Sequence, residues 1–208
     1  EIIPANPRKS YDVRRIIELI SDKDSVFEKK PSYARNIVTS FACLNGRPVG
    51  FVANQTRHLA GMLDVKACEK ASHFIGLCDA FGLPLVMLID LPGFAIGSEA
   101  EKAGLGRRSG RLFFEMGQAT VPRVSIVLRK GYGGGYYAMG GGRAYDNNAS
   151  LAWPTAEICA MSVEGSVDVA YRRDYEAAED PAARRQEIID LFKSQLGAVR
   201  AAEAFGID

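Results

Sequence analysis

"PRVSIVLRKGYGGGYYAM", residues 122–139, shows most clearly the order of elements from which the fold class is predicted. Residues 124–128 form an apolar run of the kind found in strands that are buried on both faces. A glycine-rich loop follows this run, and a helix is predicted to open near Tyr136. The same order of strand, loop and helix recurs along the chain. It predicts an α/β fold with short crossovers.

The other elements are predicted from helical periodicity, β-rich runs, capping residues and turn residues. They are a helix capped by Asp12, a hairpin of residues 37–44 and 49–53 around Asn45-Gly46, a helix capped by Asp64 and ended by Gly82, a buried strand at 84–90, a helix-compatible stretch over about 98–120, a strand ending at 152–154, a helix from Ala156, and an amphipathic helix over 181–205. No repeat or linker interrupts this pattern.

Composition excludes several classes of function. The 26 basic and 25 acidic residues nearly cancel and form no polybasic run, so neither nucleic acid nor a membrane surface is an expected partner. No apolar stretch approaches the ~20 residues that span a bilayer. Four scattered cysteines and the lack of a signal peptide predict a reduced compartment, the cytoplasm or, in a eukaryote, the mitochondrial matrix. With only two histidines, no metal site is expected.

The glycine-rich loop fits two nucleotide-binding patterns poorly. Residues 133–138 match G-x-G-x-x-A, but four residues separate the apolar run from Gly133, and no acidic residue ends the next strand. Residues 90–93 match the D-x-x-G of GTPases, but the sequence contains no Gly-Lys dipeptide and hence no P-loop. Both nucleotide interpretations are therefore disfavoured.

Side chains for nucleophilic or acid–base chemistry are also scarce. There is no G-x-S-x-G motif, His73 falls inside a predicted helix, and Glu101 and Glu157 have no evident partner. Backbone amides in a glycine-rich loop that opens a helix favour negative charge, so the loop is either an oxyanion hole or a structural turn. The residues alone leave these two interpretations equal.

A longer stretch resembles a known family. "VGFVANQTRHLAGMLDVKACEKASHFIGLCDAFGLPLVMLIDLPGF", residues 49–94, is similar to the C-terminal half of biotin-dependent acyl-CoA carboxyltransferases, the β subunits of propionyl-CoA and related carboxylases. The similarity continues through Gly97, Glu101 and Gly104, and through residues 119–139 and 152–158. It implies a crotonase-like (ClpP/crotonase) fold, a spiral of ββα units.

This resemblance also implies the chemistry. Carboxybiotin on a separate carrier domain would deliver its carboxyl group to the α-carbon of an acyl-CoA of the propionyl or acetyl class. The backbone amides of Gly134 and Gly135 would form the biotin-side oxyanion hole, and Gly133 would allow the tight turn before them. Tyr136, Tyr137, Phe94 and Gly97 would lie near substrate or biotin. Asn54, Gln55 and Gly61 would lie on the acyl-CoA side, or be satisfied loop amides. Arg129 and Lys130 would bind a carboxylate or phosphate, or be solvated.

Two departures from the family limit the transfer of a substrate. The family commonly has Gly-Gly-Ala-Tyr-Asp where this chain has Gly133, Gly134, Gly135, Tyr136 and Tyr137. Tyr137 in place of Asp is therefore expected to change acyl-chain selection. The second departure is at residues 107–110, where the family tends to have a basic residue followed by His-Gly-Ala.

The extent of the resemblance predicts that residues 1–208 are the C-terminal carboxyltransferase domain, without the family's N-terminal half and final segment. Expected partners are that N-terminal half from a neighbouring subunit, a biotin carboxyl carrier domain, a biotin carboxylase subunit, and further copies in a hexamer. The isolated domain is expected to be inert. Two alternatives stay open: a decarboxylase α subunit that transfers the carboxyl group from acyl-CoA to biotin, and a non-catalytic assembly domain.

Overall fold

A computed structural model describes residues 2–143, 145, 147–204 and 206–208. Strands of one mixed sheet form its centre, in the order β1-β2-β3-β4-β5-β6, with β7 paired to β5. The strands are β1 (Phe27–Glu28), β2 (Ile37–Leu44), β3 (Arg47–Asn54), β4 (Leu85–Leu91), β5 (Arg123–Tyr132), β6 (Ala149–Ala152) and β7 (Glu157–Cys159). The pairs from β1 to β3 are antiparallel, and those from β3 to β6 are parallel.

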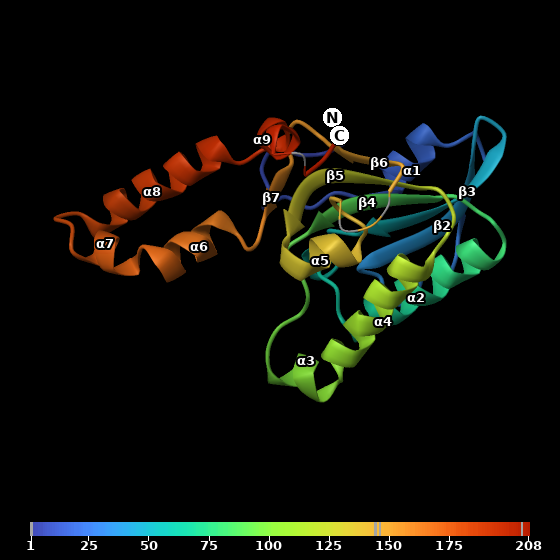
Figure 1. Ribbon diagram of the computed structural model, residues 1–208, viewed down its shortest axis with the longest axis horizontal. Helices are drawn as coiled ribbons and strands as arrows, with labels where there is room; N and C mark the ends of the chain where they lie inside the picture. Colours follow the sequence, from blue (N-terminus) through green and yellow to red (C-terminus); the bar gives the residue numbers. More distant parts are fainter. Residues whose placement is uncertain (1, 144, 146, 205) are drawn as a thin grey trace.

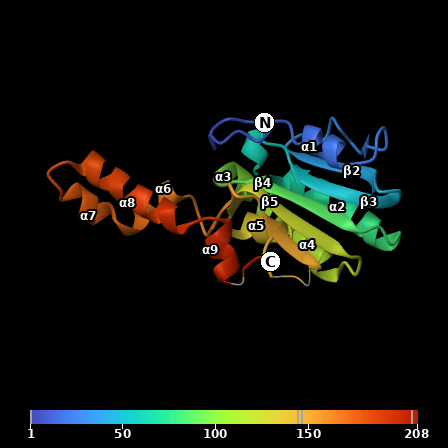
Figure 2. The same ribbon diagram turned by 90° about the horizontal axis from the view of Figure 1, so that it is seen from above.

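Helices cover both faces of the sheet (Figures 1 and 2). The helical segments are α1 (Arg14–Ile20), η1 (Leu59–Gly61), α2 (Val65–Ala80), α3 (Ser98–Lys102), α4 (Leu105–Gln118), α5 (Gly133–Ala138), α6 (Val163–Ala170), α7 (Arg172–Glu176), α8 (Pro181–Gln195) and α9 (Ala198–Glu203). Helix α1 lies on one face, and α2 and α4 lie on the other.

Two predictions from local sequence signals are confirmed. Asn45 and Gly46 take positive φ angles of 54° and 76° and join β2 to β3, because a two-residue hairpin turn needs this conformation. The Asp64 side chain accepts a hydrogen bond from the Ala67 N–H at the start of α2. The hairpin followed by α2 is a ββα unit.

The core lies on both sides of the apolar strand β4, of which every residue is buried. One cluster, which includes Phe74, Leu91 and Leu112, fills the space between the sheet and helices α2 and α4. A second, which includes Ile17 and Phe51, lies under α1. Because β4 is covered on both faces, its carboxyl end is a rigid support for the loop that follows.

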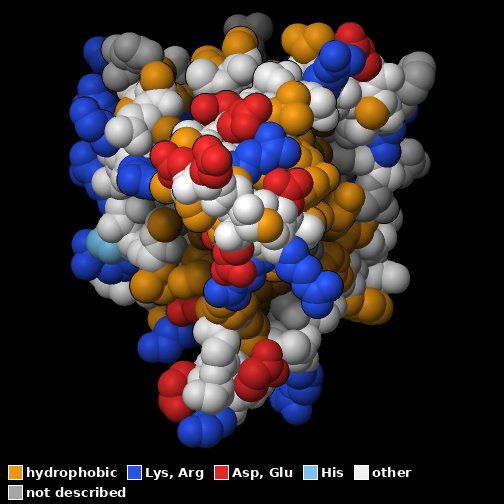
Figure 3. All heavy atoms as spheres, turned by 90° about the vertical axis from the view of Figure 1, so that its left-hand side faces the viewer, with side chains coloured by type: hydrophobic (Ala, Val, Ile, Leu, Met, Phe, Trp, Pro, Cys, Tyr) orange, Lys and Arg blue, Asp and Glu red, His pale blue; other side chains and the backbone are white. Residues whose placement is uncertain are grey.

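Helices α6 to α8 form an arm that extends away from the sheet (Figures 1 and 2). A small core of Val163, Val167, Ile188 and Ile189 holds the arm together. Viewed end-on, the arm carries charged side chains of both signs, with hydrophobic side chains exposed around it (Figure 3).

Several expected boundaries are wrong. The stretch over 98–120 is two helices, because the chain turns at Gly104 with a φ of 78°. The helix expected from Ala156 is strand β7, and a helix begins only at Val163. The N-cap residue of α1 is Val13, whereas Asp12 was expected. The Asp12 carboxylate nevertheless accepts a hydrogen bond from the Arg14 N–H. The final helix is interrupted at Gly197, and its expected end, Phe205, lies outside the described residues.

Candidate active site

A hollow of about 450 Å³ lies where the carboxyl ends of β4 and β5 meet the base of the arm. Three segments line it: residues 92–94 with Ile96 after β4, residues 132–134 after β5, and residues 160–162 with Gly165 and Val169 at the start of the arm. Glycines and apolar side chains dominate this lining. We call it the glycine hollow.

Gly133 makes the turn into α5. Strand β5 continues through Tyr132, and the helix begins directly at Gly133, not near Tyr136. Gly133 therefore follows the strand directly, and the expected four-residue gap, an argument against a dinucleotide-binding turn, is wrong. The lack of an acidic residue at the end of β6 still disfavours such a turn. Gly133 has a φ of 58°, and a Cβ here would lie 2.8 Å from the carbonyl oxygen of Ala160. Only glycine fits this position without strain.

Gly134 and Gly135 occupy the first turn of α5, where backbone amides have no carbonyl acceptor within their own helix. A Cβ on Gly134 would lie 3.5 Å from the Phe94 ring, at the wall of the hollow. A Cβ on Gly135 would lie 2.7 Å from Leu91 Cδ1 and 3.0 Å from Gly93 Cα. Leu91 thus occupies the room that an alanine methyl at 135 would need.

A buried ion pair fixes the strand ends beneath the hollow. Arg129 Nε lies 2.8 Å from Asp90 Oδ2, and the two side chains are 3% and 0% exposed. The Tyr11 hydroxyl donates to the same oxygen, and the Lys130 N–H donates to Oδ1. Both expectations for the Arg129 side chain, ligand binding and solvation, are therefore wrong.

Glu157 also has a partner, contrary to the sequence-based expectation. The Tyr132 hydroxyl donates to Glu157 Oε2 over 2.6 Å, and this bond joins β5 to β7 next to the hollow. Burial, followed by the hydrogen bond to this carboxylate, raises the pKa of Tyr132 far above its ordinary value. Tyr132 is therefore a neutral hydrogen-bond donor at physiological pH.

The structure brings Phe94, Gly133 and Gly134 together in the hollow and places four other expected residues outside its lining. Gly135 is buried beneath the turn, and Tyr136 packs against Gly141 in the core. Tyr137 is 46% exposed, with its ring 5.2 Å from that of Tyr136. Gly97 is exposed and precedes α3.

Asn54 and Gln55 are buried amides with partners inside the protein. Asn54 Nδ2 donates to the Gly61 carbonyl, and its oxygen accepts from the Asp90 N–H. Gln55 Nε2 donates to Asp12 over 2.6 Å. Gly61 must be glycine, because a Cβ would lie 2.5 Å from the Asp90 carbonyl oxygen. These contacts hold the segment before Leu63, which hydrogen-bonds to the loop at Gly93.

Sequence reasoning missed the arm's contribution, namely Met161, Ser162, Gly165 and Val169. The signal available was Ser162, whose hydroxyl accepts from the Gly165 N–H as an N-cap. Because a helix was expected from Ala156, the later start of a helix at Val163 was not predicted.

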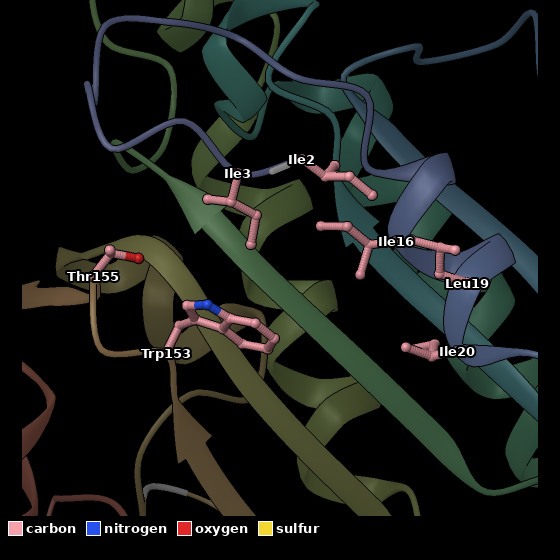
Figure 4. A pocket seen from close by; sticks show the side chains of 7 residues that line it. All are labelled: Ile2, Ile3, Ile16, Leu19, Ile20, Trp153 and Thr155. Atoms are coloured by element: carbon pink, nitrogen blue, oxygen red, sulfur yellow. The ribbon is translucent and has the colours of Figure 1, made fainter.

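A second hollow, of about 350 Å³, lies between α1 and the end of β6 (Figure 4). It is lined by Ile2, Ile3, Ile16, Leu19, Ile20, Trp153 and Thr155. Among the described residues of this lining, the single hydroxyl is that of Thr155, which donates to the Leu128 carbonyl, and none of them is a titratable or activated nucleophilic group.

Comparisons with known proteins identify the family. The carboxyl transferase domain matches residues 1–208. This chain belongs to the carboxyl transferase family.

Two relatives illustrate the range of the family. The methylmalonyl-CoA carboxyltransferase 12S subunit of Propionibacterium freudenreichii subsp. shermanii is 43% identical over 206 residues, which are 99% of this chain and 39% of that protein. The methylmalonyl-CoA decarboxylase subunit alpha of Propionigenium modestum is 39% identical over 194 residues, 93% of this chain and 37% of that protein. The chain thus spans about two fifths of the length of these relatives.

Solved structures of carboxyltransferases have the same fold. The transcarboxylase 12S hexamer with methylmalonyl-coenzyme A and methylmalonic acid bound superimposes with a TM-score of 0.96 at 42% identity, covering 100% of this chain and 40% of that one. The geranyl-CoA carboxylase β subunit of P. aeruginosa gives a TM-score of 0.87 at 27% identity, with the same coverage. The predicted family and the crotonase-like fold are both confirmed.

The described residues contain neither a metal-binding cluster nor a membrane-spanning helix. No group of three or more His, Cys, Asp or Glu side chains is arranged to hold a metal ion. No helix there has the length and apolar character needed to cross a bilayer.

Proposed function

We propose that residues 1–208 are the C-terminal, biotin-side domain of a biotin-dependent acyl-CoA carboxyltransferase. The observation that carries this proposal is the glycine hollow, formed by the Gly133 turn, the Phe94 loop and the arm in a chain of this family. The substrate class is a propionyl- or acetyl-type CoA thioester. The relatives' names support this class, since they include methylmalonyl-CoA and propionyl-CoA enzymes.

The lining of the hollow fits biotin. Gly134 has no side chain beside the Phe94 ring, so a planar urea ring could approach its backbone amide. Met161, Val169 and Ile96 supply apolar walls for its rings and side arm. Gly134 and Gly135 supply amide donors at a helix start, which match the acceptor oxygen of a urea. Biotin itself supplies the carboxyl group and the base, so the protein needs no acid–base side chain here.

The role of this chain's own residues is to bind and orient biotin. The amides of Gly134 and Gly135 donate to the oxygen on which negative charge develops during transfer. Such a donor is worth about 3–4 kcal/mol of activation free energy. Phe94 excludes water from this oxygen and thereby strengthens the hydrogen bonds to it. Leu91, Gly93 and the Asp90–Arg129 pair hold the donors in place.

The acyl-CoA side is completed by other parts of the assembly. Because the amides of Asn54 and Gln55 are used internally, we assign them a positioning role: with Gly61 they hold the segment that pairs with the Phe94 loop. Ile96 and Val169, 91% and 76% exposed at the rim of the hollow, fit a surface that a neighbouring N-terminal half covers. A biotin carrier domain, a biotin carboxylase subunit and a homohexamer complete the proposed assembly. The isolated chain is inert.

The reverse direction is the second candidate. The similarity to a methylmalonyl-CoA decarboxylase α subunit favours it, since that protein is 39% identical over nearly the whole chain. In this case the same amides would serve carboxyl transfer from acyl-CoA to biotin.

The experiment uses the complete protein that contains this chain, with free biotin and a panel of labelled acyl-CoA and carboxyacyl-CoA thioesters. We expect biotin-dependent movement of the carboxyl label, and the favoured direction distinguishes the two candidates. Carboxyl transfer by residues 1–208 alone would contradict the incomplete site. Absence of transfer with every thioester, in a protein that binds them, would support a non-catalytic assembly domain instead.

A further inference from the structure

A third hollow, which is polar and has a volume of about 500 Å³, lies between α2, α4 and the loop after β1. Four cationic side chains line it: Lys30, Lys70, Arg108 and Arg111. Tyr33, Glu69 and His73 complete the lining. None of these described residues lines the glycine hollow, so this basic cleft is a separate feature.

Lys70 is a buried cation at the floor of the basic cleft. It is 3% exposed, and its ammonium donates to the carbonyl oxygens of Tyr33 and Ile37, each over 2.8 Å. Among the described residues, no carboxylate lies within ion-pair distance of it. Its positive charge is therefore held by backbone dipoles and is not neutralised by an acid.

The two arginines are only partly neutralised. Arg108 pairs with Glu69 over 3.1 Å, and Arg111 pairs with Glu115 over 3.4 Å. Lys30 is exposed at the mouth, and the described ion pairs include none that it makes. Four cations thus face two carboxylates, which leaves the cleft with net positive charge.

His73 lies among these charges. Burial lowers its pKa first, and Lys30, Lys29 and Arg111 lower it further, while Glu115 opposes them. The groups that face it are Lys29 and Lys30 from the loop, Glu69 and Lys70 on its own helix, and Arg111 and Glu115 from α4. Cations therefore outnumber carboxylates around this exposed imidazole.

We propose that the basic cleft binds a phosphate-bearing anion with two or more negative charges. Arginine forks bind phosphate or carboxylate oxygens in pairs, and the excess of two positive charges in the cleft favours a phosphate-bearing anion over a single carboxylate. The phosphates come either from the CoA thioester or from a separate phosphorylated metabolite. Anion binding by the basic cleft is separate from the proposed carboxyl transfer, since the cleft shares no described lining residue with the glycine hollow, whereas its assignment to the CoA thioester rests on the proposed function.

The test measures binding of labelled pyrophosphate to the complete protein by equilibrium dialysis. Saturable binding that weakens with added KCl is expected, because salt screens exposed charges. Arg108→Gln and Arg111→Gln should each raise the dissociation constant about tenfold, the loss expected for a charge-assisted hydrogen bond. Arg107→Gln is the matched control, since Arg107 is exposed on the same helix but does not line the cleft. It should change the dissociation constant by less than about twofold.

Glu69→Gln provides a prediction of opposite sign. Removing the acid that pairs with Arg108 should tighten pyrophosphate binding, a result that damage to the fold would not produce. Pyrophosphate should also slow carbethoxylation of His73, followed by peptide mass spectrometry, because a bound anion covers the imidazole and raises its pKa.

A competition experiment with coenzyme A identifies the source of the phosphates. Displacement of pyrophosphate by coenzyme A, lost in Arg108→Gln, would support the site as the phosphate end of the thioester. Saturable pyrophosphate binding that coenzyme A does not displace would support a separate metabolite. The proposal would be overturned if pyrophosphate showed no saturable binding, including the case in which an acidic segment of the assembled protein already fills the cleft. It would also be overturned if Arg107→Gln and Arg108→Gln weakened binding equally.

Discussion

Asp90 and Arg129 form a buried ion pair, 2.8 Å from Oδ2 to Nε, at the carboxyl ends of β4 and β5. The same guanidinium donates to the carbonyls of Asn6 and Lys9 and lies over the Tyr11 ring at 4.9 Å. Strand β4 ends one residue beyond Asp90 and strand β5 ends three residues beyond Arg129, and each chain segment then enters the lining of the glycine hollow. This pair therefore links the N-terminal segment to the loops that form the site.

Asp90→Asn should destabilise the fold strongly, because it leaves the Arg129 charge buried without its counter-ion. The expected loss in the free energy of unfolding is about 3–5 kcal/mol, measured by urea denaturation. Asp168→Asn, which breaks the half-exposed pair with Arg185, is the control and should change stability little. Equal losses in the two variants would show that burial of the Asp90 pair does not determine its contribution to the free energy of unfolding.

Leu91 and Gly135 should be energetically coupled. Gly135→Ala places a methyl group 2.7 Å from Leu91 Cδ1 and should cost about 1–3 kcal/mol of stability. Leu91→Val makes room, so the double variant should lose less than the sum of the two single variants, as measured in a double-mutant cycle. Additive losses would mean that the contact with the Gly93 backbone, and not with Leu91, sets the cost.

The half-exposed Tyr137 should restrict the acyl chain. Tyr137→Ile and Tyr137→Asp remove a ring that lies one helical turn into α5, next to Tyr136. Relative kcat/KM for longer acyl chains should rise about tenfold in the complete enzyme, measured across acetyl-, propionyl- and butyryl-CoA. An unchanged order of preference would remove Tyr137 from substrate selection.

Lys70 should make stability depend on pH between about 8 and 10.5. Burial lowers its pKa from 10.5 to about 8, so in this window the unfolded chain binds more protons than the folded one. By linkage the contribution of Lys70 to stability then rises with pH, by at most about 3 kcal/mol. The stability of the wild type relative to Lys70→Met should therefore increase from pH 8 to 10 in urea melts. A constant difference would show that the carbonyl acceptors fully offset burial.

Local signals predicted the parts of the fold that local physics determines. Asn45-Gly46 fixed the hairpin, and Asp64 fixed the start of α2. The extent of β5 could not be predicted, because Arg129 is charged and enters the sheet only through Asp90, a residue 39 positions away. Strand β7 was mistaken for a helix because its partner β5 and the Tyr132–Glu157 bond are likewise distant in sequence.

The candidate site was partly predictable for the same reason. Gly133 could be singled out because a tight turn after a strand needs glycine. The side of the hollow formed by Met161 and Val169 depends on how the arm packs, which no local pattern encodes.

The most direct test of the proposed biotin-side oxyanion hole compares Gly134→Pro with Gly134→Ala in the complete protein. Both add atoms beside Phe94, where a Cβ meets the ring at 3.5 Å, but only proline removes the amide donor. Proline is tolerated in the first turn of a helix, and thermal melts would confirm that each variant is folded. We expect that Gly134→Pro still binds acyl-CoA but loses about 10²–10³-fold in the rate of carboxyl transfer to free biotin, while Gly134→Ala retains most of it. Equal rates in two folded variants would contradict a catalytic role for the Gly134 amide.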